Sequence, residues 1–334
     1  MRHVSITSSI LLIVGVILAA CAPQAAPQPA QPPPPAAPAA TEAPAAAPPA
    51  TATEAPAAAP PAANPTAAPA GVTHVNVPGD LPAGKGKFLG DQSTVSSLDK
   101  ARALVGDKFA AGKFERPYNA NAMDVYFPYL DIVSGNLYQD ATWFYARITL
   151  VGPDSSGAFP AKYALEVDTN MDGRGDFLVL ANYPSDTTWS TDRVQVLQDA
   201  NHDIGGTAVL MADSGGKGDG YEAVVFDSGT GADPDAAWAR LDPSDAKSVD
   251  IAFKIDLLGG DKTYMVGLWA GTDALNPAFF DLNDHYSHAD AGDPNPDVTA
   301  DYPLKALAEL DNTCRQAMGF VASGKEPGIC SQGQ

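Results

Sequence analysis

The sequence predicts a mainly β protein whose folded part is an antiparallel β-sandwich with a few peripheral helices. Two observations predict this fold class. From about residue 120 onward, short segments rich in aromatic and β-branched residues recur, each bounded by clusters of Gly, Asp, Asn or Pro. Almost no helical pattern separates these segments, which favours a sandwich over a parallel α/β sheet.

The expected elements follow in chain order. We expect a helix over 93–111, where Leu98, Leu104 and Phe109 fall at roughly helical spacing after a start rich in Ser and Thr. After Pro117 the pattern changes to strands, and a last helix is expected over 304–318. The expected strands are residues 123–132, 143–151, 161–167, 177–181, 194–198, 221–226, 249–255 and 264–270.

The N-terminus has the pattern of a secretory signal peptide over residues 1–20. A basic residue, Arg2, precedes an apolar run that ends at Ala20 and is too short to span a membrane. The sequence from Leu18 to Cys21 resembles the lipobox of bacterial lipoproteins. This resemblance implies cleavage before Cys21 and a lipid on its sulfur, and hence an extracytoplasmic protein anchored to a bacterial membrane, at the cell surface or in the periplasm. An ordinary signal peptide followed by an unrelated Cys is the alternative.

Residues 21–70 are nearly all Ala and Pro, so they cannot form a packed core and we expect a disordered linker. Dense Pro favours extended polyproline II, which would reach up to roughly 150 Å at ~3.1 Å per residue. Residues 71–334 have ordinary complexity without a second boundary. They are therefore expected to form a single domain that the linker holds away from the membrane.

Cysteine usage predicts one disulfide. The chain contains 3 Cys. If Cys21 carries lipid, Cys314 and Cys330 remain as an even pair in an oxidising compartment. A disulfide between them would contribute on the order of 3 kcal/mol in the chain-entropy model. A metal site built on these two Cys has less support, because no Cys-x-x-Cys or nearby His completes it.

The net charge is −20, from 40 acidic and 20 basic residues. Such a protein repels nucleic acid and anionic lipid head groups, so we expect neither as a partner. Divalent cations held by several carboxylates would explain part of the excess. Solubility or adaptation to a salty habitat would explain it as well.

The strongest local signal is the acidic loop between the strands expected at 161–167 and 177–181. Oxygen-bearing side chains at alternate positions, followed by Gly173 at a sharp turn, are what Ca²⁺ needs to gather ligands from a short segment. An Asp/Asn/Gly hairpin turn is the alternative. The expected ligands are Asp168, Asn170, Asp172 and Asp176, with the backbone carbonyl of Arg174.

Up to its ninth position this loop resembles the calcium loops of EF-hands and dockerins. The twelfth position is Val179 in place of the bidentate Glu, and the flanking segments have strand patterns. The loop is therefore more similar to Asp-x-Asp-x-Asp-Gly-x-x-Asp calcium turns between strands of bacterial surface proteins. That resemblance implies a calcium ion with a structural role and leaves a sixth or seventh ligand unassigned.

Two further polar clusters are candidate sites. Asp199, Asn201 and Asp203 alternate after a strand and could form a second calcium turn or an ordinary turn. His285 and His288, with Asp284, could hold a transition metal if the segment is helical, although a polar surface loop explains them better.

The sequence contains no motif for nucleophilic catalysis or nucleotide binding. The pattern over 120–270 resembles the jelly-roll-like β-sandwich modules, similar to carbohydrate-binding modules, of bacterial extracellular proteins. The lipobox, the linker, the acidic turns and the missing catalytic motif together favour a non-enzymatic, calcium-binding surface module whose ligand could be a glycan, with Trp189 in a loop as a possible contact. A lipid-anchored hydrolase with a carboxylate- or metal-based site and a structural envelope protein are the alternatives, so enzymatic activity stays open.

Overall fold

The structure is a computed structural model, and it describes residues 72–84, 86–100, 106–204, 218–292 and 303–331. All of them belong to one compact unit of residues 67–334. The strands are β1 (Lys87–Gly90), β2 (Glu115–Arg116), β3 (Ile132–Gln139), β4 (Trp143–Leu150), β5 (Lys162–Asp168), β6 (Phe177–Asn182), β7 (Val194–Gln198), β8 (Ala223–Asp227), β9 (Thr230–Gly231), β10 (Ala237–Leu241), β11 (Ser248–Lys254), β12 (Tyr264–Gly271), β13 (Leu310–Asn312) and β14 (Gln316–Met318).

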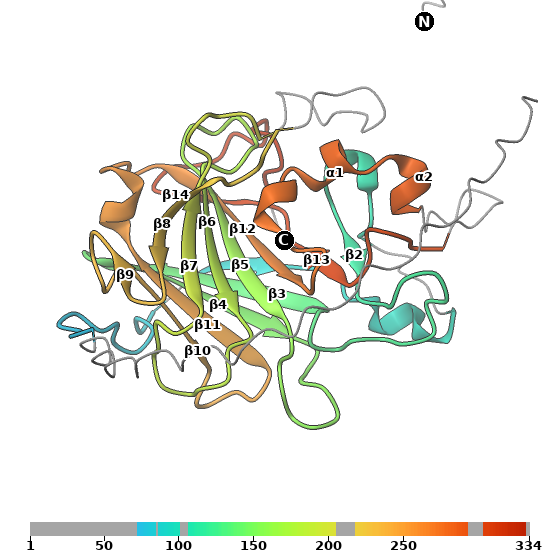
Figure 1. The fold of residues 1–334 in the computed structure, drawn as a ribbon, viewed down its shortest axis with the longest axis horizontal. Helices are drawn as coiled ribbons and strands as arrows, with labels where there is room; N and C mark the ends of the chain where they lie inside the picture. Colours follow the sequence, from blue (N-terminus) through green and yellow to red (C-terminus); the bar gives the residue numbers. More distant parts are fainter. Residues whose placement is uncertain (1–71, 85, 101–105, 205–217, 293–302, 332–334) are drawn as a thin grey trace, which may run out of the picture. The chain divides into compact units, whose positions relative to one another are not determined.

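The strands form two antiparallel sheets, which confirms the expected mainly β class (Figure 1). The five-stranded sheet has the order β1-β3-β4-β11-β10. The nine-stranded sheet has the order β2-β13-β12-β5-β6-β7-β8-β9, and β14 also pairs with β12. The helical elements are the short α1 (Leu282–His285) and α2 (His288–Ala291), and the 3₁₀ turns Thr94–Lys100, Phe109–Ala111, Ile255–Leu258 and Pro277–Phe279. No helix in the described part of the chain is long and apolar enough to cross a bilayer.

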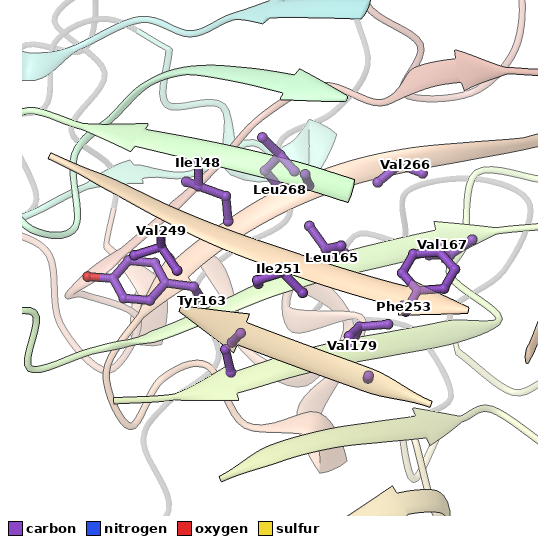
Figure 2. Packing of buried hydrophobic residues seen from close by; sticks show 14 of the residues in the cluster. Ile148, Tyr163, Leu165, Val167, Val179, Val249, Ile251, Phe253, Val266 and Leu268 are labelled. Carbon is purple, nitrogen blue, oxygen red and sulfur yellow. The ribbon is translucent and has the colours of Figure 1, made fainter. Parts of the chain in front are cut away.

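The core lies between the two sheets. Along β5, Tyr163, Leu165 and Val167 face this core, and the residues between them face the opposite side of the sheet, as the two-residue period of a strand requires. At Gly135 in β3 a Cβ atom would lie 2.2 Å from Leu268 Cδ1 in β12, so glycine permits the close contact of the sheets there. Figure 2 shows the residues that meet in this layer, Ile148, Val249, Ile251 and Phe253 from one sheet and Tyr163, Leu165, Val167, Val179, Val266 and Leu268 from the other.

The outer face of the nine-stranded sheet is covered as well. Leu178, Leu180 and Trp269 on this face pack against Phe280 and Leu310 and their neighbours in a second apolar cluster. The central strands are therefore buried on both faces, which explains why β5 and β12 are apolar along most of their length.

Several expected elements are wrong. The helix expected over 304–318 is absent, and β13 and β14 lie there instead, because these residues pair with β12. Within 93–111 the described residues form two 3₁₀ turns, and 101–105 lie outside the description. The segment expected as a strand over 123–132 is irregular as far as Ile132, where β3 begins, apart from an isolated β-bridge between Tyr126 and Tyr118. Strands β3 and β10 were missed because long-range pairing, rather than local propensity, makes them strands.

Candidate metal centres

The first acidic loop connects β5 to β6 and begins at Asp168, the last residue of β5. Asp168 is fully buried, and its Oδ1 and Oδ2 accept hydrogen bonds from the N–H groups of Met171 at 2.5 Å and Gly173 at 2.8 Å. Gly173 has a φ of +93°, and a Cβ atom there would lie 2.4 Å from Cβ of Pro327. Glycine is therefore required at this turn, and the loop's own amides hold the first predicted ligand in place.

The other predicted side-chain ligands belong to the same hydrogen-bonded loop. Asn170 Oδ1 accepts the N–H of Asp172 at 2.9 Å, and Asp172 Oδ1 accepts the N–H of Arg174 at 2.9 Å. Asp176 Oδ2 accepts the N–H of Thr169 at 2.6 Å and its hydroxyl at 2.7 Å. Asn170 Nδ2 also donates to Asp176 Oδ1 at 3.2 Å. Asp172 is exposed, so its carboxylate lies at the solvent side of the loop.

The second acidic loop follows β7 and shares two side-chain hydrogen bonds with the first. Asp199 Oδ2 accepts the N–H of Ile204 at 3.2 Å, as Asp168 accepts that of Gly173 five residues later. Asn201 Oδ1 accepts the N–H of Asp203 at 3.1 Å. Asn201 Nδ2 in turn donates to Asp219 Oδ1 at 3.0 Å.

The two loops are neighbours at one end of the nine-stranded sheet, because β5 and β7 both flank β6. Each has a left-handed residue at its fourth position, Met171 with φ 63° and His202 with φ 58°. The N–H of Asp199 donates to the carbonyl of Asp176 at 3.0 Å, and His202 Nδ1 lies 3.6 Å from Asp176 Oδ1. The structure therefore brings both predicted clusters together.

Electrostatics at these loops favour an added positive charge. Burial raises the pKa of Asp168 to about 7, against the opposing effects of the Arg315 charge and the amides of Gly173 and Met171. Burial likewise raises the pKa of Asp199. A carboxylate with a raised pKa needs a proton or a cation nearby at neutral pH.

A small cavity of about 70 Å³ adjoins the first loop and is bordered by Glu166 and Asp281. Glu166 accepts hydrogen bonds from Tyr221 Oη at 3.1 Å, Trp269 Nε1 at 2.9 Å and Arg315 Nη2 at 3.0 Å. The side chain of Arg174 pairs with Asp281. Both carboxylates are therefore fixed by arginines, which suits a structural role better than proton transfer.

Sequence reasoning missed a second acidic centre. The ligand atoms of Asp91, Glu115 and Asp311 lie within 4.8 Å of one another, and among the described residues no other three His, Cys, Asp or Glu side chains form such a group. Asp91 follows β1, while Glu115 in β2 pairs with Asp311 in β13. The carboxylates of the first acidic loop are not so arranged, because each turns toward amides of its own loop. The sequence signal that could have revealed this centre is an acidic residue within a strand, Glu115 in β2 and Asp311 in β13. The sequence pattern predicted neither of these strands.

The remaining predicted residues have different outcomes. The disulfide between Cys314 and Cys330 is confirmed. Cys21 and the segments 1–20 and 21–70 lie outside the described residues. The side chains of Asp284 and His288 lie outside the description too, so a metal site there stays a prediction.

Trp189 is partly buried and well anchored. Its Nε1 donates to the carbonyl of Gly79 at 2.9 Å, and the guanidinium of Arg240 lies 4.4 Å from its ring centre. Its ring also packs near that of Tyr145, with centres 6.3 Å apart. One face of the indole is thus in contact with Arg240, which leaves limited area for stacking a sugar.

Comparisons with known protein families, with curated proteins and with solved structures find no match.

Proposed function

We propose that the chain is a non-enzymatic, calcium-stabilised surface module, tethered to a bacterial membrane by lipid on Cys21, whose sandwich binds a ligand such as a glycan. The observation that carries the calcium part is the pair of neighbouring acidic loops with one hydrogen-bond pattern. The lipobox-like sequence and the Ala/Pro-rich linker support the tether.

The chemistry of the loops favours Ca²⁺. Their side-chain ligands are oxygens, and Ca²⁺ takes about 6–8 oxygen ligands in flexible geometry. A carboxylate oxygen has two lone pairs, so the single hydrogen bonds to the oxygens of Asp168, to Asp172 Oδ1 and to Asp176 Oδ1 each leave a lone pair for an ion, whereas Asp176 Oδ2 is already used by Thr169. Extracellular modules bind calcium with dissociation constants of about 10⁻⁴–10⁻³ M, so incomplete ligation is sufficient in that compartment.

Thermal unfolding in calcium and in chelator tests this proposal. With about 5 mM calcium, binding at these affinities stabilises the folded state by roughly 1–2 kcal/mol, which raises Tm by roughly 2–8 °C in a domain of this size. In Asp172→Asn the side-chain oxygen can still accept the N–H of Arg174, but the charge is lost. We expect this variant to lose most of the calcium-dependent shift.

Asp261→Asn is the matched control, because Asp261 is an exposed acid in a turn outside both loops. It should keep the full shift. An unchanged Tm on chelation of the wild-type protein would refute the calcium part of the proposal.

Glycan arrays and pulldown with cell-wall material, both in calcium, test the ligand part. Binding that is reduced by chelation is the expected result. Absence of binding together with self-association would instead favour a structural protein of the cell envelope.

A further inference from the structure

A cluster of four acidic side chains, none of which belongs to the two acidic loops, joins Asp91, Glu115 and Asp131 from the N-terminal part of the domain to Asp311 from its C-terminal part. Glu115, Asp131 and Asp311 are almost fully buried, with exposed fractions of 2%, 0% and 0%. Asp91 is less buried and borders a cavity of about 410 Å³ that Glu115 also lines. Figure 1 shows β2 and β13, which carry Glu115 and Asp311, side by side.

Each of three carboxylates in this cluster has an oxygen without a hydrogen-bond partner. Asp311 Oδ2 accepts the N–H of Ile132 at 2.6 Å, while its Oδ1 has no partner. Asp131 Oδ2 accepts the hydroxyl of Tyr126 at 2.7 Å, while its Oδ1 has none, and Asp91 Oδ2 also has none. Buried polar atoms in folded proteins are nearly always paired, so three unpaired oxygens in one place indicate a missing partner.

Among the described residues, the basic side chains of Lys113 and Arg116 near the cluster do not balance its four carboxylates. The charge of Lys113 lowers the pKa of Asp91 and so only partly offsets the effect of burial. Arg116, next to Glu115, is bound to Asp107 through Nε at 2.6 Å and to the carbonyls of Ala291 and Leu307 through Nη1 at 2.9 Å each.

Burial raises the pKa of Asp91 to about 7 and that of Asp131 to about 6. Burial and neighbouring carboxylates raise those of Glu115 and Asp311 well above their usual value. At neutral pH these carboxylates therefore need a proton or a cation near them.

We propose that Asp91, Glu115 and Asp311, supported by Asp131, form a second divalent-cation site that takes Ca²⁺ and fastens β13 to the N-terminal part of the domain. Oxygen ligands alone select a hard cation. Two oxygens on opposite sides of a calcium ion are about 4.6–5.2 Å apart, twice the metal–oxygen distance, so ligand atoms within 4.8 Å of one another fit around one ion. The adjoining cavity gives the ion a path to the site and room for water ligands.

The test is the number of calcium ions bound per full-length chain, measured by equilibrium dialysis near neutral pH. Asp311→Asn retains an oxygen for the N–H of Ile132 and removes one charge. This variant and Glu115→Gln should each lower the affinity of one site by about tenfold or more, since ligand charge sets calcium affinity. Terbium as a calcium substitute gives a second readout, because the hydroxyl of Tyr126 donates to Asp131 of the cluster at 2.7 Å and a nearby tyrosine can sensitise terbium luminescence.

Asp91→Asn is the second test variant, for the case that a substitution at the more buried Asp311 or Glu115 prevents folding. In chelator all three variants should be at least as stable as the wild type, because each removes a repelling charge, and calcium should no longer stabilise this part of the protein. Variants of Asp311 and Asp91 that both bind the wild-type number of ions with wild-type affinity would overturn the proposal.

The same measurement separates this site from the acidic loops. Asp172→Asn should leave ion binding at the buried cluster unchanged. If Asp172→Asn removes an ion and Asp311→Asn does not, the loop proposal stands and this inference fails. If Asp311→Asn removes an ion and Asp172→Asn does not, the buried cluster binds calcium and the proposal that the acidic loops bind it fails.

Discussion

Gly135 shows how one missing methyl group sets a distance inside the core. A Cβ atom at this position would lie 2.2 Å from Leu268 Cδ1 across the two sheets. Gly135→Ala should therefore force the sheets or Leu268 to move, at a cost of about 1–3 kcal/mol in the free energy of unfolding. Denaturant titration measures this change.

Gly152→Ala is the control for that substitution. A Cβ atom at Gly152 would have no atom within 4 Å. This variant should be neutral or stabilised by up to about 1 kcal/mol, because alanine restricts the unfolded chain. Equal destabilisation of both variants would contradict the role assigned to Gly135.

Structural features that depend on residues close together in the sequence could be predicted. The pairing of Cys314 with Cys330 and the turn formed by Asp168 and Gly173 depend on short-range spacing, and the structure contains both. The buried cluster depends on the register that puts Asp311 beside Glu115, from opposite ends of the domain. No local pattern specifies that register.

At the scale of elements, the C-terminal tail illustrates tertiary control of local structure. Its spacing of Leu304, Leu307 and Ala308 suggests a helix, yet the chain after it forms β13 and β14 against β12. Hydrogen bonds from Arg315 to Gly328 and from Cys330 to Arg315 then fold the end of the chain back on itself. Pairing with the long central strand β12 outweighs a weak helical preference.

The disulfide should contribute measurably to the stability of this tail. It joins residues 16 apart, so its loss should lower the free energy of unfolding by about 3 kcal/mol in the chain-entropy model. The double variant Cys314→Ser/Cys330→Ser is expected to show this loss in denaturant titration. Reductant should destabilise the wild type equally and leave the double variant unchanged. A reductant effect on the double variant would assign the change to another group.

At the scale of the whole domain, Asp235 anchors the segment that leads in from the linker. Its Oδ2 accepts the N–H groups of Val75 at 2.9 Å and Asn76 at 2.8 Å, and its Oδ1 lies 2.7 Å from His74 Nδ1. Burial opposes ionisation of Asp235, but these hydrogen bonds outweigh it and lower its pKa. One carboxylate thus holds His74, Val75 and Asn76 at the start of the domain.

The pH dependence of this attachment follows from the direction of the shift. A pKa below the unfolded value means that Asp235 stabilises the folded state above about pH 4 and that this contribution is lost as the pH falls further. NMR titration should give a pKa below that of an ordinary Asp. Hydrogen exchange at neutral pH should be faster at Val75 and Asn76 in Asp235→Ala and unchanged in Asp80→Ala, which removes an exposed acid from the same segment.

The order of strands in the nine-stranded sheet could not be predicted from the sequence. As with the buried cluster, the reason is that no local pattern specifies which distant segments pair. Turn residues mark where strands end, and they gave the mainly β class and most of the strands from β4 to β12. They carry no information on which distant strands become neighbours. The β2–β13 pair, for example, joins Arg116 to Leu310, from opposite ends of the domain.

The position of β13 also determines when folding can finish. Synthesis delivers the N-terminal residues first, so one side of β12 has no strand to pair with until residues 310–318 emerge. Pairings between distant segments form slowly, because the chain must lose entropy before contacts repay it. Asp311 is the last of the four clustered acids to arrive. Until residues 310–318 are made, one edge of β12 stays open. A cation that binds Asp311 together with Glu115 would therefore stabilise only the completed sheet.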